Sequence, residues 1–175
     1  MQKKELMPAR IMIDEGLALQ RVESDDAEDL FQIIQSAPEI KLNVTWPASV
    51  NSVEDTSESI KYLLKEDKFQ PYALKENNST IGYIGTWKPD NKQHEIGFSY
   101  FLDKNKRGRG YVTRALQRLM QVAKEKLQAR MFVVNIIDTN EASKAIAAKL
   151  GFEATDKLLK DEVLKAMLRR YERPA

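Results

Sequence analysis

Residues 104–110 bring four cationic side chains and two glycines into one short segment. The cations are Lys104, Lys106, Arg107 and Arg109, and the glycines are Gly108 and Gly110. A glycine lets the backbone approach a ligand closely, because no side chain stands in the way. A helix that begins directly after such a turn also points unpaired N–H groups and the positive end of its dipole at the ligand. The segment therefore predicts a site that holds phosphate.

Two common nucleotide-binding motifs do not explain this turn. A Walker-type loop needs Gly-Lys followed by Ser or Thr, and the chain lacks that sequence. The dinucleotide fingerprint Gly-x-Gly-x-x-Gly fails at its third glycine, where Thr113 stands, and no strand–helix–strand unit opens the chain. On its own, the turn fits a plain loop with solvated charges at a helix start equally well.

The residues around the turn predict the elements that position it. Residues 96–102 are rich in aromatic and branched side chains over a strand-like length. After the turn, a helix with one buried face is indicated by the helical spacing of Val112, Ala115, Leu116, Leu119, Met120, Ala123 and Leu127. The apolar run 131–137 predicts a central strand, which a strand–helix–strand unit places parallel to 96–102. A helix over about 140–150 follows and ends at Gly151.

The rest of the chain completes an α+β fold with one mixed sheet. The elements expected before the turn are a hairpin of 11–13 with 17–22, a helix capped by Ser24 and ended by Pro38, a loop over 39–51, a helix that starts after Ser52 with Val53, Ile60 and Leu64 facing inward, and an antiparallel meander of 72–76, 80–87 and 95–102 whose second turn is Pro89-Asp90-Asn91. Two last strands are expected at 152–159 and 163–171.

Composition limits the function classes. The 175 residues suit a single domain, and 42% hydrophobic with 31% charged residues is ordinary for a globular protein. The lack of cysteine excludes disulfides and thiolate metal sites, and a single histidine, His94, disfavours a zinc site or a Ser-His-Asp triad. We therefore expect no metal. The net charge of +2 is too small for a nucleic-acid surface.

No segment is expected to enter a membrane. No run approaches the ~20 apolar residues that span a bilayer, and residues 1–6 are not followed by the apolar core of a signal peptide. A cytoplasmic protein is therefore expected.

Two short motifs lie on the predicted elements. The first is Arg107-Gly108-Arg109-Gly110-Tyr111, and the second, roughly 30 residues later, is Asn140-Glu141-Ala142-Ser143 with Lys149-Leu150-Gly151-Phe152. With the element order, they resemble the GNAT superfamily of acetyl-CoA-dependent N-acetyltransferases, over about residues 17–171. The resemblance implies one N-acetyltransferase domain over 1–175, acetyl-CoA as co-substrate, and a mixed, mostly antiparallel sheet with splayed central parallel strands, flanked by helices.

The resemblance also implies how acetyl-CoA binds. Its pyrophosphate would meet N–H groups of the turn, its pantetheine arm Asn140, and its thioester oxygen N–H groups near Phe101 and Leu102. The implied residues are Phe101, Leu102, Asn105, Lys106, Arg107, Gly108, Arg109, Gly110, Tyr111, Val112, Asn140 and Ser143. The family motif opens with Gln or Arg three residues before its first glycine, where this chain has Asn105. We therefore expect the affinity for the coenzyme to be altered but not lost. Asn140 also suits a helix cap.

A catalytic pair is implied as well. Many members carry a tyrosine acid four residues before Gly-Phe, where this chain has Ala147. A subgroup similar to the ribosomal-protein-serine N-acetyltransferases uses the serine of Asn-x-x-Ser instead, with a later glutamate as base, which matches Ser143 and Glu162. Glu95 is the second candidate for the base, because other branches place theirs on that strand. It stays open whether Glu162 only belongs to a charged hairpin turn and Ser143 only caps its helix.

The acceptor pocket has candidate walls in Trp46, Trp87 and Phe98, and also in Tyr83. Core packing is the favoured alternative for all but Trp46, which lies in a polar loop. The favoured acceptor is the α-amine of a protein or peptide, and the alternative is a small-molecule amine (an aminoacyl conjugate, polyamine or antibiotic) in detoxification or self-immunity. A non-catalytic acetyl-CoA-binding module is disfavoured because the serine and glutamate pair is present. The subgroup resemblance also implies a homodimer.

Overall fold

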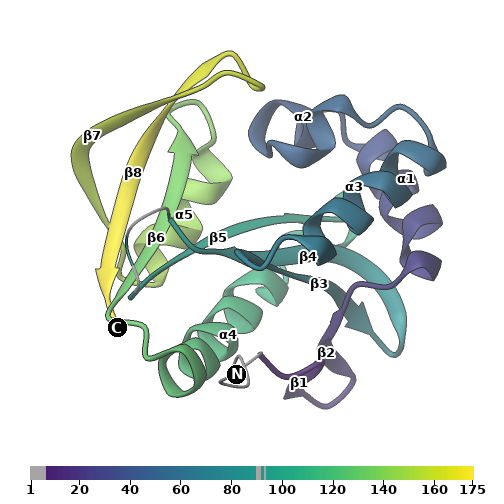
Figure 1. The fold of residues 1–175 in the computed structure, drawn as a ribbon, viewed down its shortest axis with the longest axis horizontal. Coiled ribbons are helices and arrows are strands. Elements are labelled where there is room, and N and C mark those ends of the chain that lie inside the picture. The colour runs from purple at the N-terminus through teal and green to yellow at the C-terminus, as the bar shows by residue number, and fades with distance from the viewer. Residues whose placement is uncertain (1–6, 90–91, 93) are drawn as a thin grey trace.

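The structure is a computed structural model that describes residues 7–89, 92 and 94–175. Its elements are, in order, β1 (Arg10–Asp14), β2 (Leu17–Arg21), the short 3-10 helix η1 (Ser24–Asp26), α1 (Ala27–Ser36), α2 (Ile40–Asn43), η2 (Trp46–Ser49), α3 (Val53–Lys65), β3 (Phe69–Glu76), β4 (Ser79–Trp87), β5 (Glu95–Leu102), η3 (Lys104–Lys106), α4 (Tyr111–Leu127), β6 (Met131–Ile137), α5 (Glu141–Lys149), β7 (Glu153–Asp161) and β8 (Ala166–Pro174). The strands form one eight-stranded sheet in the order β1-β2-β3-β4-β5-β6-β8-β7 (Figure 1). Neighbouring strands are antiparallel, except that β5 and β6 are parallel. The mixed α+β fold is therefore confirmed.

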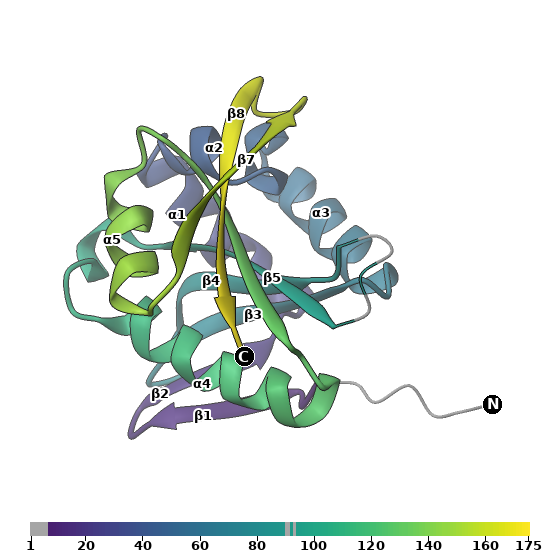
Figure 2. The same ribbon diagram turned by 90° about the vertical axis from the view of Figure 1, so that its left-hand side faces the viewer.

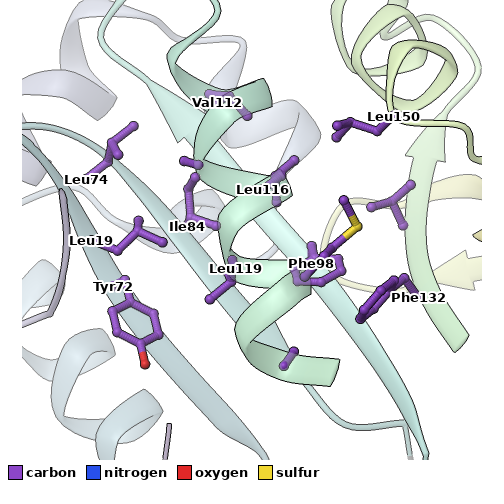
Figure 3. Packing of buried hydrophobic residues seen from close by; sticks show 14 of the residues in the cluster. Leu19, Tyr72, Leu74, Ile84, Phe98, Val112, Leu116, Leu119, Phe132 and Leu150 are labelled. Atoms are coloured by element: carbon purple, nitrogen blue, oxygen red, sulfur yellow. The ribbon is translucent and has the colours of Figure 1, made fainter. Parts of the chain in front are cut away.

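Helices cover both faces of the sheet. α4 lies on one face, and α1 and α3 lie on the other (Figures 1 and 2). The apolar stripe predicted for α4 packs in one cluster with strand residues such as Leu74, Ile84 and Phe98 (Figure 3). A second cluster includes Leu30 of α1 and Ile60 of α3. Burial of such stripes supplies most of the stability of a helix.

The two central strands separate part-way along their length. Their paired residues are Glu95 with Met131, Ile96 with Phe132, and Gly97 with Val133. Beyond these, β5 continues beside β4 and β6 continues beside β8, and no pairing between β5 and β6 is present among the described residues. Strands that part in this way leave backbone N–H and C=O groups available in the gap. The expected splay is confirmed, and it opens beside the predicted phosphate turn.

Three local predictions differ from the structure. The segment 39–51 is not a plain loop, because it contains α2 and η2. Ser24 does not cap α1 but belongs to η1, and α1 begins at Ala27. In α3 Ile60 is buried as predicted, but Leu63 is buried in place of Leu64, which is exposed. The first two differences come from short helical turns that periodicity over a few residues does not resolve.

The other predicted elements are confirmed, with ends shifted by up to three residues. Ser52 caps α3 through a 3.0 Å hydrogen bond from the Asp55 N–H. Asp90 and Asn91 of the predicted turn, and residues 1–6, lie outside the described residues. Within the described part of the chain, no helix is both long and apolar enough to cross a membrane.

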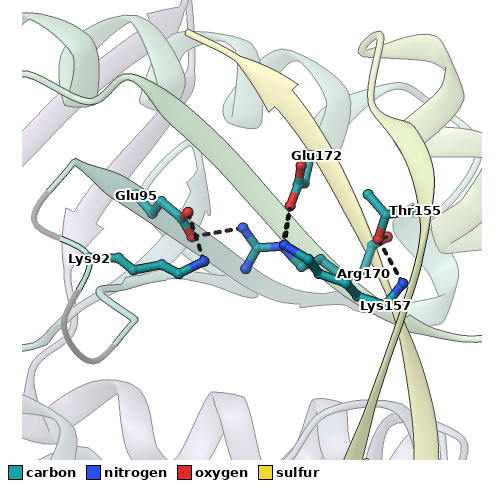
Figure 4. A network of polar contacts seen from close by, with 6 residues as sticks. All are labelled: Lys92, Glu95, Thr155, Lys157, Arg170 and Glu172. Atoms are coloured by element: carbon teal, nitrogen blue, oxygen red, sulfur yellow. Dashed lines mark hydrogen bonds and ion pairs between the residues drawn. The ribbon is translucent and has the colours of Figure 1, made fainter.

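A buried arginine on β8 ties that strand to β5. Arg170 Nη2 donates to Glu95 at 2.7 Å, and its Nε donates to Glu172 at 2.5 Å (Figure 4). Partial burial raises the pKa of Glu95, but hydrogen bonds from Arg170 and Lys92 outweigh it and leave that pKa below its ordinary value. The network therefore holds Glu95 as a carboxylate.

Replacing Arg170 with Met is expected to destabilise the protein by about 3 kcal/mol at pH 7, because Glu95 and Glu172 would lose their buried cation. A lowered carboxyl pKa gives stability that is complete above the ordinary value of about 4.3 and lost as pH falls through the folded value. The difference between Arg170→Met and wild type should therefore shrink at pH 3 in urea unfolding. Arg169→Met, which removes an ion pair to the exposed Asp138, is the control. An equal deficit at both pH values would contradict the prediction.

Candidate active site

A cleft of about 570 Å³ lies where β5 and β6 part. Its walls are formed by the second half of β5 with Trp87 at the end of β4, the turn and first residues of α4, the second half of β6, and α5, and a rim completes them. The rim is made by the segment from Glu39 to Thr45 and by the end of β7 with the start of β8. Of the predicted site residues, the cleft brings together Trp87, Phe98, Phe101, Leu102, Arg107, Gly108, Gly110, Tyr111, Val112, Asn140 and Ser143.

The glycine turn has the geometry of an anion site. Gly108 and Gly110 have φ of +75° and +74°, a left-handed conformation that favours glycine. A Cβ on either glycine would meet no atom within 4 Å, so open space lies over the backbone. Gly110 immediately precedes α4, and no side chain caps that helix. The first N–H groups of α4 are therefore available to a ligand in the cleft.

Two of the four cations of the turn pair with carboxylates of other segments. Arg107 donates to Glu39 at 2.5 Å, and Lys106 and the Tyr111 hydroxyl both donate to Glu76. The hydrogen bond from Arg107 lowers the pKa of Glu39, and those from Lys106 and Tyr111 lower the pKa of Glu76. These contacts fix the turn against α2 and β3.

Other residues of the turn lie outside the main cleft. Arg109 lines a neighbouring hollow of about 480 Å³ with Arg114 and Lys149. Asn105 lies in η3, where its N–H donates to Asp103 at 2.9 Å. Neither Asn105 nor Lys106 lines the cleft.

The start of α5 faces the cleft from the opposite side. Asn140 caps the helix, since its Oδ1 accepts from the Ser143 N–H at 3.1 Å, so the cap predicted for Asn140 is present. Ser143 also lies beside Tyr100, a residue that the sequence reasoning missed. Burial raises the pKa of Tyr100, the contact with Ser143 acts in the opposite direction, and the net pKa is raised. The Tyr100 hydroxyl is therefore protonated at neutral pH. Ala147, at the family's usual tyrosine position, is buried in the core.

The two candidate bases lie in different places. Glu162 lies in the turn between β7 and β8, where it is 76% exposed and pairs with Lys160 at 2.9 Å. Its neighbour Asp161, which was not predicted, lines the cleft instead. Glu95 lies at the far end of β5, is engaged by Arg170 and does not line the cleft. Among the described residues, neither carboxylate contacts Ser143, and neither lines the cleft. The identity of the general base therefore stays a prediction.

The match to known proteins is broad. The acetyltransferase (GNAT) domain matches residues 17–153. The chain belongs to the GNAT acetyltransferase family. The ribosomal-protein-serine acetyltransferase of Escherichia coli (strain K12) is 28% identical over 152 residues, which cover 83% of this chain and 84% of that protein. The uncharacterized N-acetyltransferase p20 of Bacillus licheniformis is 26% identical over 84% of each chain.

Solved structures of acetyltransferases share the fold. A ribosomal L7/L12 α-N-protein acetyltransferase in complex with coenzyme A has a TM-score of 0.83 and 20% identity over 94% of this chain and 97% of that one. The microcin C7 self-immunity acetyltransferase, in complex with acetyl-CoA and AMP, has a TM-score of 0.83 and 24% identity over 98% and 99%. The protein is thus an acyltransferase, and acetyl-CoA is its co-substrate.

The residues present fit that co-substrate. The open space over Gly108 and Gly110 leaves room for a phosphate against the backbone, and the uncapped start of α4 supplies donors. The gap between β5 and β6 leads from this turn to Ser143. No group of three or more His, Cys, Asp and Glu side chains that could hold a metal ion occurs among the described residues of this GNAT enzyme.

The aromatic residues divide between core and cleft. Trp46 does not line the cleft but packs on Tyr83 and Phe101, with ring centroids 5.2 and 5.6 Å apart. Tyr83 is buried, as its core interpretation predicts. Trp87 lines the cleft, and Phe98 both lines it and packs on Phe132.

Sequence reasoning missed Asn135, whose buried Oδ1 has no hydrogen-bond partner among the described residues although the residue lines the cleft. Its place in an otherwise apolar strand was the available signal.

Gly97 allows Trp87 to lie flat against β5. A Cβ at Gly97 would stand 2.0 Å from the Trp87 indole. We expect Gly97→Ala to displace Trp87, to cost about 1–3 kcal/mol of stability and to raise the KM for the amine. Urea unfolding and steady-state kinetics measure these effects. In a Trp87→Ala background the added cost of Gly97→Ala should vanish. A cost that persists there would assign the strain to another neighbour.

Proposed function

We propose that this GNAT enzyme acetylates the N-terminal α-amine of a protein or peptide. The observation that carries the proposal is the single cleft lined by both the glycine turn and the Ser143 end of α5. The acceptor class is supported by similarity to the E. coli enzyme, whose name specifies a ribosomal-protein serine. The Ser143 and Glu162 pair of the related subgroup supports it too.

The turn holds the donor in this proposal. N–H groups at the start of α4 bind the pyrophosphate, and we assign the opening Arg of the family motif to Arg107. Arg107 lines the cleft three residues before Gly110, whereas Asn105 does not line it. Asn140 orients the pantetheine arm. Acetyl-CoA, when bound, supplies a thioester, and N–H groups near Phe101 and Leu102 stabilise negative charge on its oxygen.

Glu162 and Ser143 move the protons. An amine is protonated at neutral pH and cannot attack until a base removes a proton, which we assign to the Glu162 carboxylate. It would act through water, because Glu162 does not line the cleft but follows the cleft-lining Asp161 in the chain. The Ser143 hydroxyl donates a hydrogen bond or proton to the leaving sulfur. Tyr100, protonated and adjacent, orients that hydroxyl. Glu95 is the weaker candidate for the base, because Arg170 holds it away from the cleft.

A small-molecule acceptor is the second candidate. It is favoured by the similarity to the microcin C7 self-immunity enzyme, a structure that holds AMP. An acetylation screen separates the two: free thiol is measured with peptides that carry different N-terminal residues, aminoacyl nucleotides, polyamines and amine antibiotics. Turnover confined to peptides supports the proposal, and turnover confined to small amines replaces it. Tight acetyl-CoA binding without any turnover would overturn the enzymatic function.

We also propose that residues 1–175 form one domain, supported by the continuous sheet from β1 to β8. A cytoplasmic location is supported by the ribosomal target named for the E. coli relative. We also propose that the enzyme is a homodimer, and analytical ultracentrifugation would measure its oligomeric state.

A further inference from the structure

Two walls of the cleft touch each other through a pair of polar side chains. Thr45 lies between α2 and η2, and Asp161 ends β7. The Thr45 hydroxyl donates to Asp161 Oδ2 at 2.9 Å, across 116 residues of sequence. Both views of the fold show the tip of the β7–β8 hairpin beside α2 (Figures 1 and 2). Both residues line the cleft, so its wall is closed at this point.

The Asp161 carboxylate uses its two oxygens for two different tasks. Oδ1 accepts from the N–H groups of Val163 and Leu164, at 2.9 and 2.8 Å, and so fixes the turn that contains Glu162. Oδ2 binds the opposite wall through Thr45. Thr45 precedes η2 but makes no side-chain cap there, so its hydroxyl serves this contact rather than the local helix.

The turn has few other anchors on the cleft side. Glu162 and Val163 are exposed, and Glu162 pairs only with its near neighbour Lys160 among the described residues. β7 is also the last strand of the sheet, so its tip has the opposite wall of the cleft as its support.

We propose that the Thr45–Asp161 hydrogen bond positions the turn that carries Glu162 beside the cleft wall that Thr45 and Asp161 form. Asp161 and Thr45 are positioning residues in this inference, which rests on the proposed role of Glu162. A base must lie within hydrogen-bond reach of the proton, directly or through one water. A displacement of about 1 Å in such a group can cost about 100-fold in rate. The same contact joins the segment just before Trp46 to the hairpin, so its loss would affect both segments.

The test is Thr45→Val, which removes the Thr45–Asp161 hydrogen bond. The two hydrogen bonds that Asp161 accepts from the N–H groups of Val163 and Leu164 stay in place. With the best acceptor of the screen, beginning with a peptide that has an N-terminal serine, kcat should fall about 10- to 100-fold. The Kd for acetyl-CoA and the melting temperature should not change. Thr45→Ser keeps the hydroxyl and should restore the rate. Thr155→Val, which removes a hydroxyl bond on the same hairpin away from the cleft, is the matched control and should behave as wild type.

A double-variant cycle isolates the contact. In an Asp161→Ala background, Thr45→Val should have no further effect on kcat, because its partner is absent. Wild-type kinetics for Thr45→Val, or a loss of rate matched by a loss of melting temperature, would overturn the inference. Glu162→Gln in the same assay separates the two proposals. An inactive Glu162→Gln beside a normal Thr45→Val overturns only the positioning role, whereas an active Glu162→Gln overturns the base assignment and this inference with it.

Discussion

Gly110→Ala is expected to weaken acetyl-CoA binding by about 100-fold. The added Cβ would project into the open space over the turn, where the phosphate is proposed to lie. It would displace the phosphate from the first N–H groups of α4. Each lost hydrogen bond to a charged group costs about 1.5–3 kcal/mol, and 1.4 kcal/mol is tenfold in affinity. Calorimetric titration with acetyl-CoA measures the change, and Gly108→Ala should act in the same direction.

The chain offers a close control for backbone strain. Gly151 has φ of +77°, and a Cβ there would also meet no atom within 4 Å, but it follows α5 and lines neither hollow. Gly151→Ala and Gly110→Ala should each lose about 1–2 kcal/mol of stability, the cost of a left-handed non-glycine residue. Only Gly110→Ala should lose acetyl-CoA. Unchanged affinity for Gly110→Ala, or an equal loss in both variants, would show that the turn does not hold the phosphate.

Glu162→Gln is expected to lower kcat by about 10²- to 10⁴-fold, the usual contribution of a general base. The amide keeps the shape of the side chain but cannot accept the amine proton. Because Glu162 is exposed, the melting temperature should not change, and the Kd for acetyl-CoA should equal that of wild type. Stopped-flow detection of free thiol with a saturating acceptor measures the rate.

Glu153→Gln, an exposed glutamate on the same hairpin, serves as the control and should retain full turnover. If Glu162→Gln retains wild-type turnover, Glu162 is not the base. The role would then pass to Glu95, or to the cleft-lining Asp161. Rate measurements on Glu95→Gln need the unfolding data beside them, because that change also disturbs the Arg170 network.

Local patterns predicted the frame of the site well. The stripe of α4 and the glycines before it identified the turn, because helix periodicity and backbone freedom are properties of neighbouring residues. The parallel pairing of β5 and β6 followed from the strand–helix–strand order. The Asn140 cap followed from its place at the start of the predicted helix.

Contacts between distant segments could not be predicted from the sequence. Thr45 and Asp161 meet only because the fold brings a hairpin tip to α2, and neither residue has an unusual local context. Tyr100 meets Ser143 across the splayed strands, and alternation along β5 does not reveal which residue faces that helix. Trp46 lies in a polar stretch, yet two short helical turns carry it onto Tyr83 and Phe101.

The separation of β5 from β6 gives the free enzyme an edge strand in the middle of its sheet. Edge strands invite pairing with other chains, and natural proteins usually cover them. In the proposed complex the cover is acetyl-CoA itself, which would link the protein's resistance to unfolding and self-association to the acetyl-CoA supply. At a ligand concentration of 100 times Kd, such linkage amounts to about 2.7 kcal/mol. In a cell that depletes acetyl-CoA, the enzyme would therefore be less stable. The abundance of this protein would then fall with the concentration of the metabolite that it consumes.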